Sequence, residues 1–134
     1  DESKAAFLKY IDSFTDAFDI VGHSLGGPIA LQWAAWMAEA GKKPDNVLLL
    51  ASPKCGDEDF AEYYNNFGIN TLRVDIYNDL IPTLPPSGVY ESPRLFLDRD
   101  GNVWNEHLTD LFHEAKNHGV ANYIRSIRCY TKQG

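Results

Sequence analysis

The chain begins with hydrophobic positions at the spacing of a helix. Four apolar residues follow one another at steps of four, three and four positions: Phe7, Ile11, Phe14 and Phe18. This is the repeat of an amphipathic helix that buries one of its faces. The pattern predicts a helix over residues 3–17.

The segment that follows has the pattern of a strand, a tight turn and a second helix. A short strand is expected over residues 19–22. The apolar helix after it runs from Gly26 to about Gly41, because Pro28 is tolerated only in the first turn of a helix and glycine suits the C-terminal end. The next run, from Asn46 to Ala51, is continuously apolar after its first residue, which is typical of a strand buried on both faces of a parallel sheet.

The rest of the chain continues this alternation. The expected elements are a helix marked by Phe60, Tyr64 and Phe67, a strand in which Leu72, Val74 and Ile76 alternate with polar residues before Asn78-Asp79, a hairpin of Leu95–Leu97 with Val103–Trp104, and a last helix with Val120, Ile124 and Ile127. Strands that alternate with helices predict an α/β fold with a mainly parallel sheet and flanking helices. We expect one domain over residues 1–134.

Composition narrows the classes of partner. The 134 residues carry 12 Lys+Arg against 19 Asp+Glu, a formal net charge of -7, which disfavours nucleic acid as a partner because such binding depends on basic side chains. The longest apolar runs are far shorter than the roughly 20 residues that span a bilayer, so no transmembrane segment is expected. The two cysteines can form at most one disulfide, and a domain of this size does not need one to close its core.

The strongest chemical motif joins the first expected strand to the second helix. Residues 22–26 read Gly22-His23-Ser24-Leu25-Gly26, which fits the G-x-S-x-G nucleophile elbow. The serine of such an elbow occupies a strained turn, and the backbone on either side of it comes very close. We therefore expect that the positions of Gly22 and Gly26 have no room for a side chain. We predict Ser24 as the nucleophile and the Leu25 backbone N–H, at the positive end of a helix dipole, as an oxyanion donor.

Other interpretations of this glycine-rich turn are weaker. Such turns also serve close packing or phosphate binding, but neither G-x-x-x-x-G-K-[ST] nor G-x-G-x-x-G occurs. His23 lies inside the motif beside the nucleophile, and we expect it to support the elbow rather than to act as the base.

An acid and a histidine must follow the serine, because an imidazole has to accept its proton and an acid has to orient that imidazole. Asp79 is favoured as the acid because it directly follows a strand at the carboxyl edge of the sheet, where open α/β sheets bind ligands. A plain turn residue is its other interpretation, and Asp57, after the preceding strand, remains an alternative acid. Asp75 is expected instead to be a solvated, ion-paired residue on the strand face that it shares with Arg73.

Three histidines follow Asp79 in the chain. His118 is favoured as the base because it precedes Gly119 at the expected opening of the last helix, a junction from which an imidazole can reach the sheet edge. His107 and His113 remain alternatives, and His113 is expected on a helix surface.

Metal chemistry is not expected. His113-Glu114 and His118 resemble a stretched H-E-x-x-H zinc motif, but a spacing of five residues sets the two rings about 140° apart around a helix. Asp98-Arg99-Asp100-Gly101 fits a hairpin turn better than a calcium loop, because the glycine comes too early and the closing Glu is missing. We therefore expect neither a metal nor a cofactor.

With these residues in hand, the sequence resembles the class 3 lipases, the fungal-type triacylglycerol lipase family of α/β hydrolases. Residues 20–27, IVGHSLGG, resemble the nucleophile segment of the family, and residues 77–86, YNDLIPTLPP, resemble its NDxVPxLPP segment, which carries the acid. Residues 51–65 are similar to its GSPRVG and FAxYxN stretch. Asn117-His118 with Asn122-Tyr123 is similar to its closing DH and NY residues.

The resemblance implies hydrolysis of carboxylic esters, of acylglycerols or related lipids, through an acyl-enzyme intermediate. It also implies that Ser24, Asp79 and His118 form the triad and that no cofactor takes part. The substrate would be an ester or lipid, with transient contact between the protein and a lipid interface.

The resemblance further indicates elements that these residues do not include. Family members carry N-terminal strands, a lid helix and a second oxyanion donor before the elbow strand, whereas one expected helix precedes it here. The chain therefore resembles a C-terminal portion, a processed product or a piece of a longer protein, whose exposed elbow strand would pair with the missing half or with a second copy. Cys129 lies where secreted family members carry a bridged cysteine, so secretion is expected, with an ordinary free cysteine as the alternative.

Two classes of function remain. The first is a lipase-like serine ester hydrolase, with a feruloyl or other non-lipid carboxylesterase as its variant, because acyl specificity depends on the lid and pocket. The second is a non-catalytic lipase-like module that binds a partner or lipid, because a single oxyanion donor stabilises the tetrahedral intermediate poorly.

Overall fold

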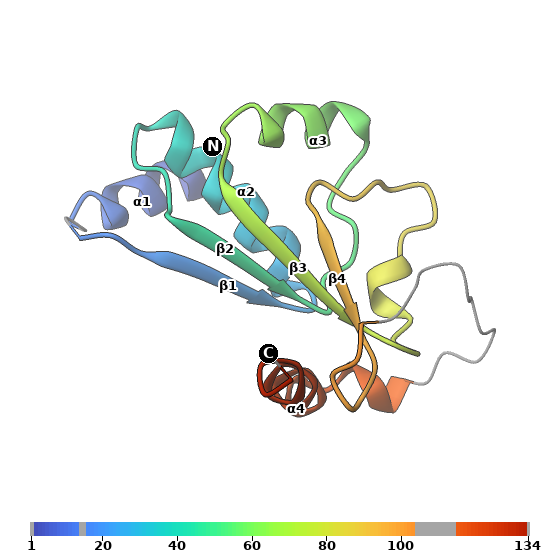
Figure 1. Cartoon of the computed structure of the whole chain (residues 1–134). Coiled ribbons are helices and arrows are strands. Elements are labelled where there is room, and N and C mark those ends of the chain that lie inside the picture. The colour runs from blue at the N-terminus through green and yellow to red at the C-terminus, as the bar shows by residue number, and fades with distance from the viewer. Residues whose placement is uncertain (1, 14–15, 104–114, 134) are drawn as a thin grey trace.

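A single parallel sheet organises the chain. The computed structural model describes residues 2–13, 16–103 and 115–133, and within them four strands pair in the order β1-β2-β3-β4 (Figure 1). The strands are β1 (Asp19–His23), β2 (Asn46–Leu50), β3 (Asn70–Ile76) and β4 (Arg94–Leu97). Every strand pair is parallel, so the carboxyl ends of the strands meet at one edge of the sheet. The predicted α/β fold with a parallel sheet is confirmed.

Helices flank this sheet on both faces. They are α1 (Glu2–Ile11), α2 (Gly26–Glu39), α3 (Glu58–Asn65) and α4 (Val120–Tyr130), with short 3₁₀ turns η1 (Ile81–Thr83) and η2 (Ala115–His118). Figure 1 shows α1 and α2 on one side of the sheet and α4 on the other. No helix in the described ranges is long and apolar enough to cross a membrane.

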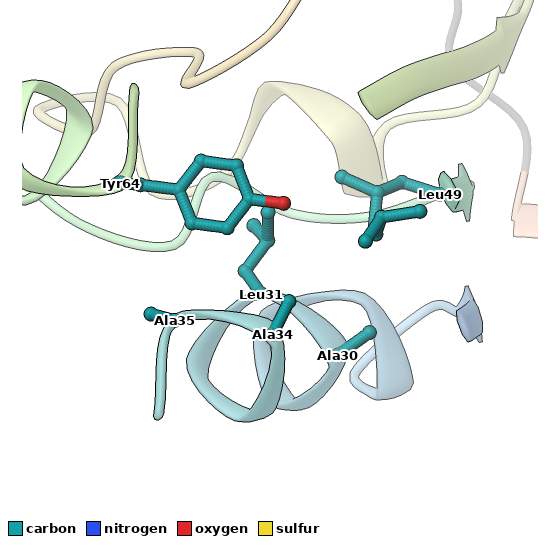
Figure 2. Packing of buried hydrophobic residues seen from close by; sticks show 7 residues of the cluster. Ala30, Leu31, Ala34, Ala35, Leu49 and Tyr64 are labelled. Atoms are coloured by element: carbon teal, nitrogen blue, oxygen red, sulfur yellow. The ribbon is translucent and has the colours of Figure 1, made fainter. Parts of the chain in front are cut away.

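Small residues bring α2 close to the sheet. Its inner face consists of Ala30, Leu31, Ala34 and Ala35, which pack with Leu49 and Val47 of β2 and with Tyr64 of α3 (Figure 2). Successive strand residues point to opposite faces, so Leu50 and Leu48 reach the other side. There the core contains Leu50, Val74, Ile76 and Leu97 with Tyr123 of α4. α2 and α4 therefore bury opposite faces of the same central strands.

The first helix is shorter than its hydrophobic repeat predicts. α1 ends at Ile11, so the prediction of a helix to residue 17 is wrong; Phe14 lies outside the described residues, and Phe18 directly precedes β1. Ser13 forms backbone and side-chain hydrogen bonds to the Tyr10 carbonyl, which tightens the last turn. Lys42, in the loop after α2, donates to the Ile11 carbonyl at 3.2 Å. A tertiary contact thus caps the helix end.

Arg73 and Asp75 of β3 are buried, so the prediction that Asp75 is solvated is wrong, whereas the prediction that it is ion-paired is confirmed. Both side chains are 0% exposed. β3 is a central strand of the sheet. Arg73 Nη2 forms an ion pair with Glu91 Oε1, in the segment that precedes β4, at 2.7 Å. Asp75 Oδ2 forms a separate ion pair with Arg94 Nε of β4, at 2.8 Å. Burial raises the pKa of Asp75 to about 6, against the opposing effect of the two arginines.

The remaining boundaries agree closely with the sequence pattern. β1, β2 and β3, together with α2 and α4, cover the predicted segments, and α3 ends just before Phe67. Of the expected hairpin, β4 contains Leu95–Leu97, and a single antiparallel bridge joins Leu97 to Val103; Trp104 lies outside the described residues. The Asp98 carboxylate accepts the Asp100 and Asn102 N–H groups, which holds the turn between them.

Candidate active site

Ser24 occupies a strained turn between β1 and α2. Its φ is 55°, in the left-handed region that side chains other than glycine rarely adopt. Its backbone N–H continues the pairing of β1 with β2 by donating to the Leu50 carbonyl at 2.9 Å, and its own carbonyl accepts the Gly27 N–H at 2.9 Å. The backbone is thus held on both sides of the residue, and the strain persists because the surrounding structure fixes it.

The glycines of the elbow do not all act as predicted. A Cβ on Gly22 would lie 2.4 Å from the Gly26 carbonyl oxygen, so its lack of a side chain is a steric requirement, as expected. A Cβ on Gly26 would meet nothing within 4 Å, so the expectation that Gly26 is also required for close approach is wrong. The second close approach is at Gly27, where a Cβ would lie 2.1 Å from Ser52 Oγ. The reason is that α2 turns Gly27, and not Gly26, toward the end of β2.

Asp79 lies at the carboxyl edge of the sheet, in the turn that follows β3. Its N–H donates to the Ile76 carbonyl at 3.2 Å, and the preceding Asn78 takes a φ of 66°. The residue is 3% exposed. One carboxylate oxygen, Oδ1, accepts the Ile81 N–H at 3.0 Å, which holds the carboxylate against η1. The other oxygen, Oδ2, faces the last helix.

His118 closes a continuous chain of hydrogen bonds. It is the last residue of η2 and is separated from α4 only by the N-cap Gly119, at the junction where the sequence predicts a base. Its Nε2 lies 2.7 Å from Ser24 Oγ, and its Nδ1 lies 2.9 Å from Asp79 Oδ2. A carboxylate can only accept, so Nδ1 carries a proton, and in the neutral ring Nε2 is the acceptor for the serine hydroxyl.

His23, the last residue of β1, contacts the backbone of His118. Its Nε2 lies 3.0 Å from the backbone carbonyl of His118 and donates to it, because a carbonyl can only accept. The two rings are 5.1 Å apart at an interplanar angle of 31°. Leu25, which follows Ser24 within the elbow, is the N-cap of α2, so its backbone N–H lies at the helix N-terminus, where N–H groups lack helical partners.

The competing residues lie elsewhere or outside the described ranges. Asp57 is the N-cap of α3, where its carboxylate accepts the Phe60 N–H at 3.1 Å. Asp75 forms an ion pair with Arg94. His107 and His113 fall within residues 104–114, outside the part that the structure describes. Among the described side chains, no group of three potential ligands is placed to hold a metal ion.

Tyr123 is a site residue that the sequence reasoning did not assign. Its hydroxyl donates to Asp79 Oδ2 at 2.7 Å from within α4, and its side chain is 0% exposed. Burial, followed by the charge of Asp79, raises the pKa of Tyr123 above its ordinary value, so the hydroxyl remains a donor. The sequence signal was the Asn122-Tyr123 pair, which resembles the closing NY residues of the class 3 lipases but does not by itself give the tyrosine a role.

Comparison with known proteins places these residues in a family context. The chain matches the family described as Lipase (class 3) over residues 4–89. Secreted mono- and diacylglycerol lipase 1 of Fusarium solani is 33% identical over 87 residues, which cover 63% of this chain and 26% of that protein. The chain therefore spans about a quarter of the length of this relative.

Solved structures show the same fold. A Rhizomucor miehei lipase propeptide complex superposes with a TM-score of 0.61 and 25% identity over 72% of this chain and 34% of that one. A triacylglycerol lipase whose catalytic centre is described as a serine protease triad gives a TM-score of 0.68 over 86% of this chain and 51% of that one. At 19% identity, this second likeness concerns the fold alone.

Proposed function

Since the chain belongs to the class 3 lipase family, we propose that it is the part of a serine ester hydrolase that carries nucleophile, base and acid. The observation that carries the proposal is the hydrogen-bond chain from Ser24 Oγ through the His118 ring to Asp79 Oδ2, at 2.7 and 2.9 Å. These distances lie within the reach that proton transfer between nucleophile and base requires.

The proposed reaction follows from the roles of these three atoms. His118 Nε2 takes the proton of Ser24 Oγ as this oxygen attacks the ester carbonyl carbon, and Asp79 stabilises the imidazolium that forms. The Leu25 N–H donates to the developing oxyanion at the N-terminus of α2. His118 then gives its proton to the departing alkoxide. In the second half, water attacks the acyl-enzyme with His118 again as base, which releases the acid and restores Ser24.

The substrate class that we propose is an acylglycerol or a related lipid ester. It is supported by the F. solani relative, which is named as a mono- and diacylglycerol lipase. Exposed apolar side chains lie near the proposed reacting residues in the chain: Leu25, next to Ser24, is 70% exposed, Leu80, next to Asp79, is 42% exposed, and Leu84, a few positions further on, is 37% exposed. Exposed leucines next to the nucleophile and the acid suit contact with acyl chains or with a lipid interface. The name of that relative also supports secretion of this protein.

A further part of the same protein is proposed to complete the sheet beyond β1. Within the described sheet β1 pairs on one side only, with β2. Beside it lies an apolar groove of about 270 Å³, lined among others by Phe7, Val21 and Trp33. The F. solani relative is more than twice as long as this chain, because the same match covers 63% of this chain and 26% of that protein, so it has residues to spare for such strands. The same part would supply a second oxyanion donor, which is worth about 10² to 10³ in kcat.

A fluorophosphonate probe tests the catalytic proposal. The full polypeptide is expected to be labelled at Ser24, and Ser24→Ala to abolish labelling. Ser87→Ala is the matched control, because Ser87 is exposed and carries no proposed role. Equal labelling of Ser24→Ala and wild type, or no labelling of the full polypeptide, would contradict the proposal.

The acyl preference is tested separately. Hydrolysis of tributyrin is expected to exceed hydrolysis of a feruloyl ester, since the exposed side chains named above are aliphatic. The reverse order would favour a non-lipid carboxylesterase.

A further inference from the structure

We propose that Tyr123 is a positioning residue of the catalytic centre, holding the carboxylate of Asp79 in the orientation that His118 requires. The inference rests on the proposed function of the Ser24 site and deepens it. Helix α4, which follows His118 in the chain, would then also hold the acid Asp79 through Tyr123.

The direction of the tyrosine hydrogen bond is set by its two partners. The backbone N–H of Ile76 donates to the Tyr123 hydroxyl oxygen at 3.3 Å. That contact occupies an oxygen lone pair, so the hydroxyl proton is left to point at Asp79 Oδ2, 2.7 Å away. The tyrosine therefore links the last residue of β3 to the acid three positions later.

Asp79 is thereby held by donors on both of its oxygens. Oδ1 accepts the Ile81 N–H, and Oδ2 accepts both the Tyr123 hydroxyl and the His118 Nδ1–H, at 2.7 and 2.9 Å. Rotation of the carboxylate would break all three bonds. Without the tyrosine, Oδ2 would be held by His118 alone, and only the Ile81 N–H among these three donors would still fix the carboxylate independently of the imidazole, so Asp79 would orient His118 less firmly.

The tyrosine itself is fixed by the core. Its ring is 0% exposed and packs in the cluster that contains Leu50, Val74 and Leu97. The His23 ring meets it edge-on at a centroid distance of 6.1 Å. Because the ring has no freedom to move without opening this cluster, its hydroxyl is a rigid reference point for Asp79.

The charge of the acid is shared as well as its position. The titratable groups that face Asp79 are His118 from η2 and Tyr123 from α4, and the charge of Asp79 also acts on Asp75 in β3. The tyrosine hydroxyl draws part of the carboxylate charge to itself. When this hydroxyl is removed, the negative charge of Asp79 Oδ2 acts on His118 alone, which favours the protonated form of the imidazole.

The test compares two buried tyrosines in the full polypeptide. Tyr123→Phe removes the hydroxyl and keeps the ring. Tyr64→Phe is the matched control, because Tyr64 is 1% exposed and its hydroxyl bonds to Thr71 Oγ1 at 2.7 Å, on the opposite face of the sheet. With a soluble nitrophenyl ester, Tyr123→Phe is expected to lower kcat about tenfold or more with little change in KM, since hydrogen bonds to charged groups are strong.

The pH profile separates positioning from a merely structural role. The acid limb of kcat/KM is expected to move to higher pH in Tyr123→Phe and to remain at the wild-type position in Tyr64→Phe. The low-field proton signal of His118 Nδ1–H is expected to move in the first variant alone. Unchanged kcat, pH profile and proton signal in a folded Tyr123→Phe would overturn the inference.

This design keeps two failures apart. If fluorophosphonate does not label Ser24 in the wild type, the proposed function fails, while the His118 proton signal still tests the contact made by Tyr123. If Ser24 is labelled and the two tyrosine variants behave alike, the inference about Tyr123 fails and the proposed function stands.

Discussion

The ion pair between Arg73 and Glu91 ties the segment after Asp79 to the centre of the sheet. Arg73 Nη2 lies 2.7 Å from Glu91 Oε1, and the two side chains are 0% and 1% exposed. Glu91→Gln removes the negative charge and nearly conserves the shape. The guanidinium of Arg73 would then remain buried, with the main-chain carbonyls of Ser52 and Pro53 as its remaining hydrogen-bond partners.

The expected loss of stability follows from this burial. Removing one partner of a buried ion pair costs about 3 to 5 kcal/mol, because the other charge is left uncompensated. Arg73 keeps two carbonyl acceptors, and the new amide oxygen can still accept, so we expect the lower end, about 3 kcal/mol. In a domain of this size that lowers Tm by about 10 °C.

An exposed pair of similar length is the control. Lys4 Nζ lies 2.6 Å from Glu39 Oε2, with side chains 34% and 39% exposed. Glu39→Gln is expected to cost less than about 1 kcal/mol, because water already screens that pair. Urea unfolding followed by far-UV circular dichroism measures both. Equal losses in the two variants would refute the argument that burial decides the worth of the Arg73 pair.

Three further predictions address the site and its supports. Asp79→Asn is expected to lower kcat about 10⁴-fold by favouring the wrong His118 tautomer. The control Asp57→Ala, which removes a helix cap, is expected to leave kcat unchanged and to lower the free energy of unfolding in urea by about 1 kcal/mol. Equal losses of kcat in the two variants would contradict the assignment of Asp79 as the acid. Gly27→Ala is expected to destabilise the fold by at least about 2 kcal/mol through its clash with Ser52, while Gly26→Ala stays within about 1 kcal/mol of wild type; the reverse ranking would contradict the elbow geometry. The pKa of Asp75 is raised to about 6 from 3.8, so the folded state binds the proton more tightly than the unfolded state, and stability falls as pH rises from about 4 to 6. Asp75→Asn is expected to reduce this fall in the free energy of unfolding by about 2 to 3 kcal/mol, measured by urea unfolding at a series of pH values.

Most of the helices and strands, and the three residues that the structure joins in one chain of hydrogen bonds, could be predicted from the amino-acid sequence. The pattern of a strand, G-x-S-x-G and a helix predicts the turn at Ser24, and the apolar run from Asn46 predicts a strand buried on both faces. Chain order and strand ends single out Asp79 and His118 for contact with Ser24, and the structure brings these three residues together. These features could be predicted because periodicity, turn residues and motif spacing are local properties of the chain.

The contacts that those residues make depend on how distant segments of the chain pack together. His118 and Ser24 are 94 positions apart, and their hydrogen bond exists because parallel strands bring their carboxyl ends to one edge. The same holds for Gly27 against Ser52 and for the burial of Asp75, both of which depend on elements distant in sequence. The alternation of polar and apolar residues in β3 indicates a half-exposed strand, yet a neighbouring strand and the segment after Asp79 cover its polar side. The position of Tyr123 in the sequence does not indicate its hydrogen-bond partner, and only packing shows that its hydroxyl donates to Asp79, because the position of one polar atom depends on every element around it.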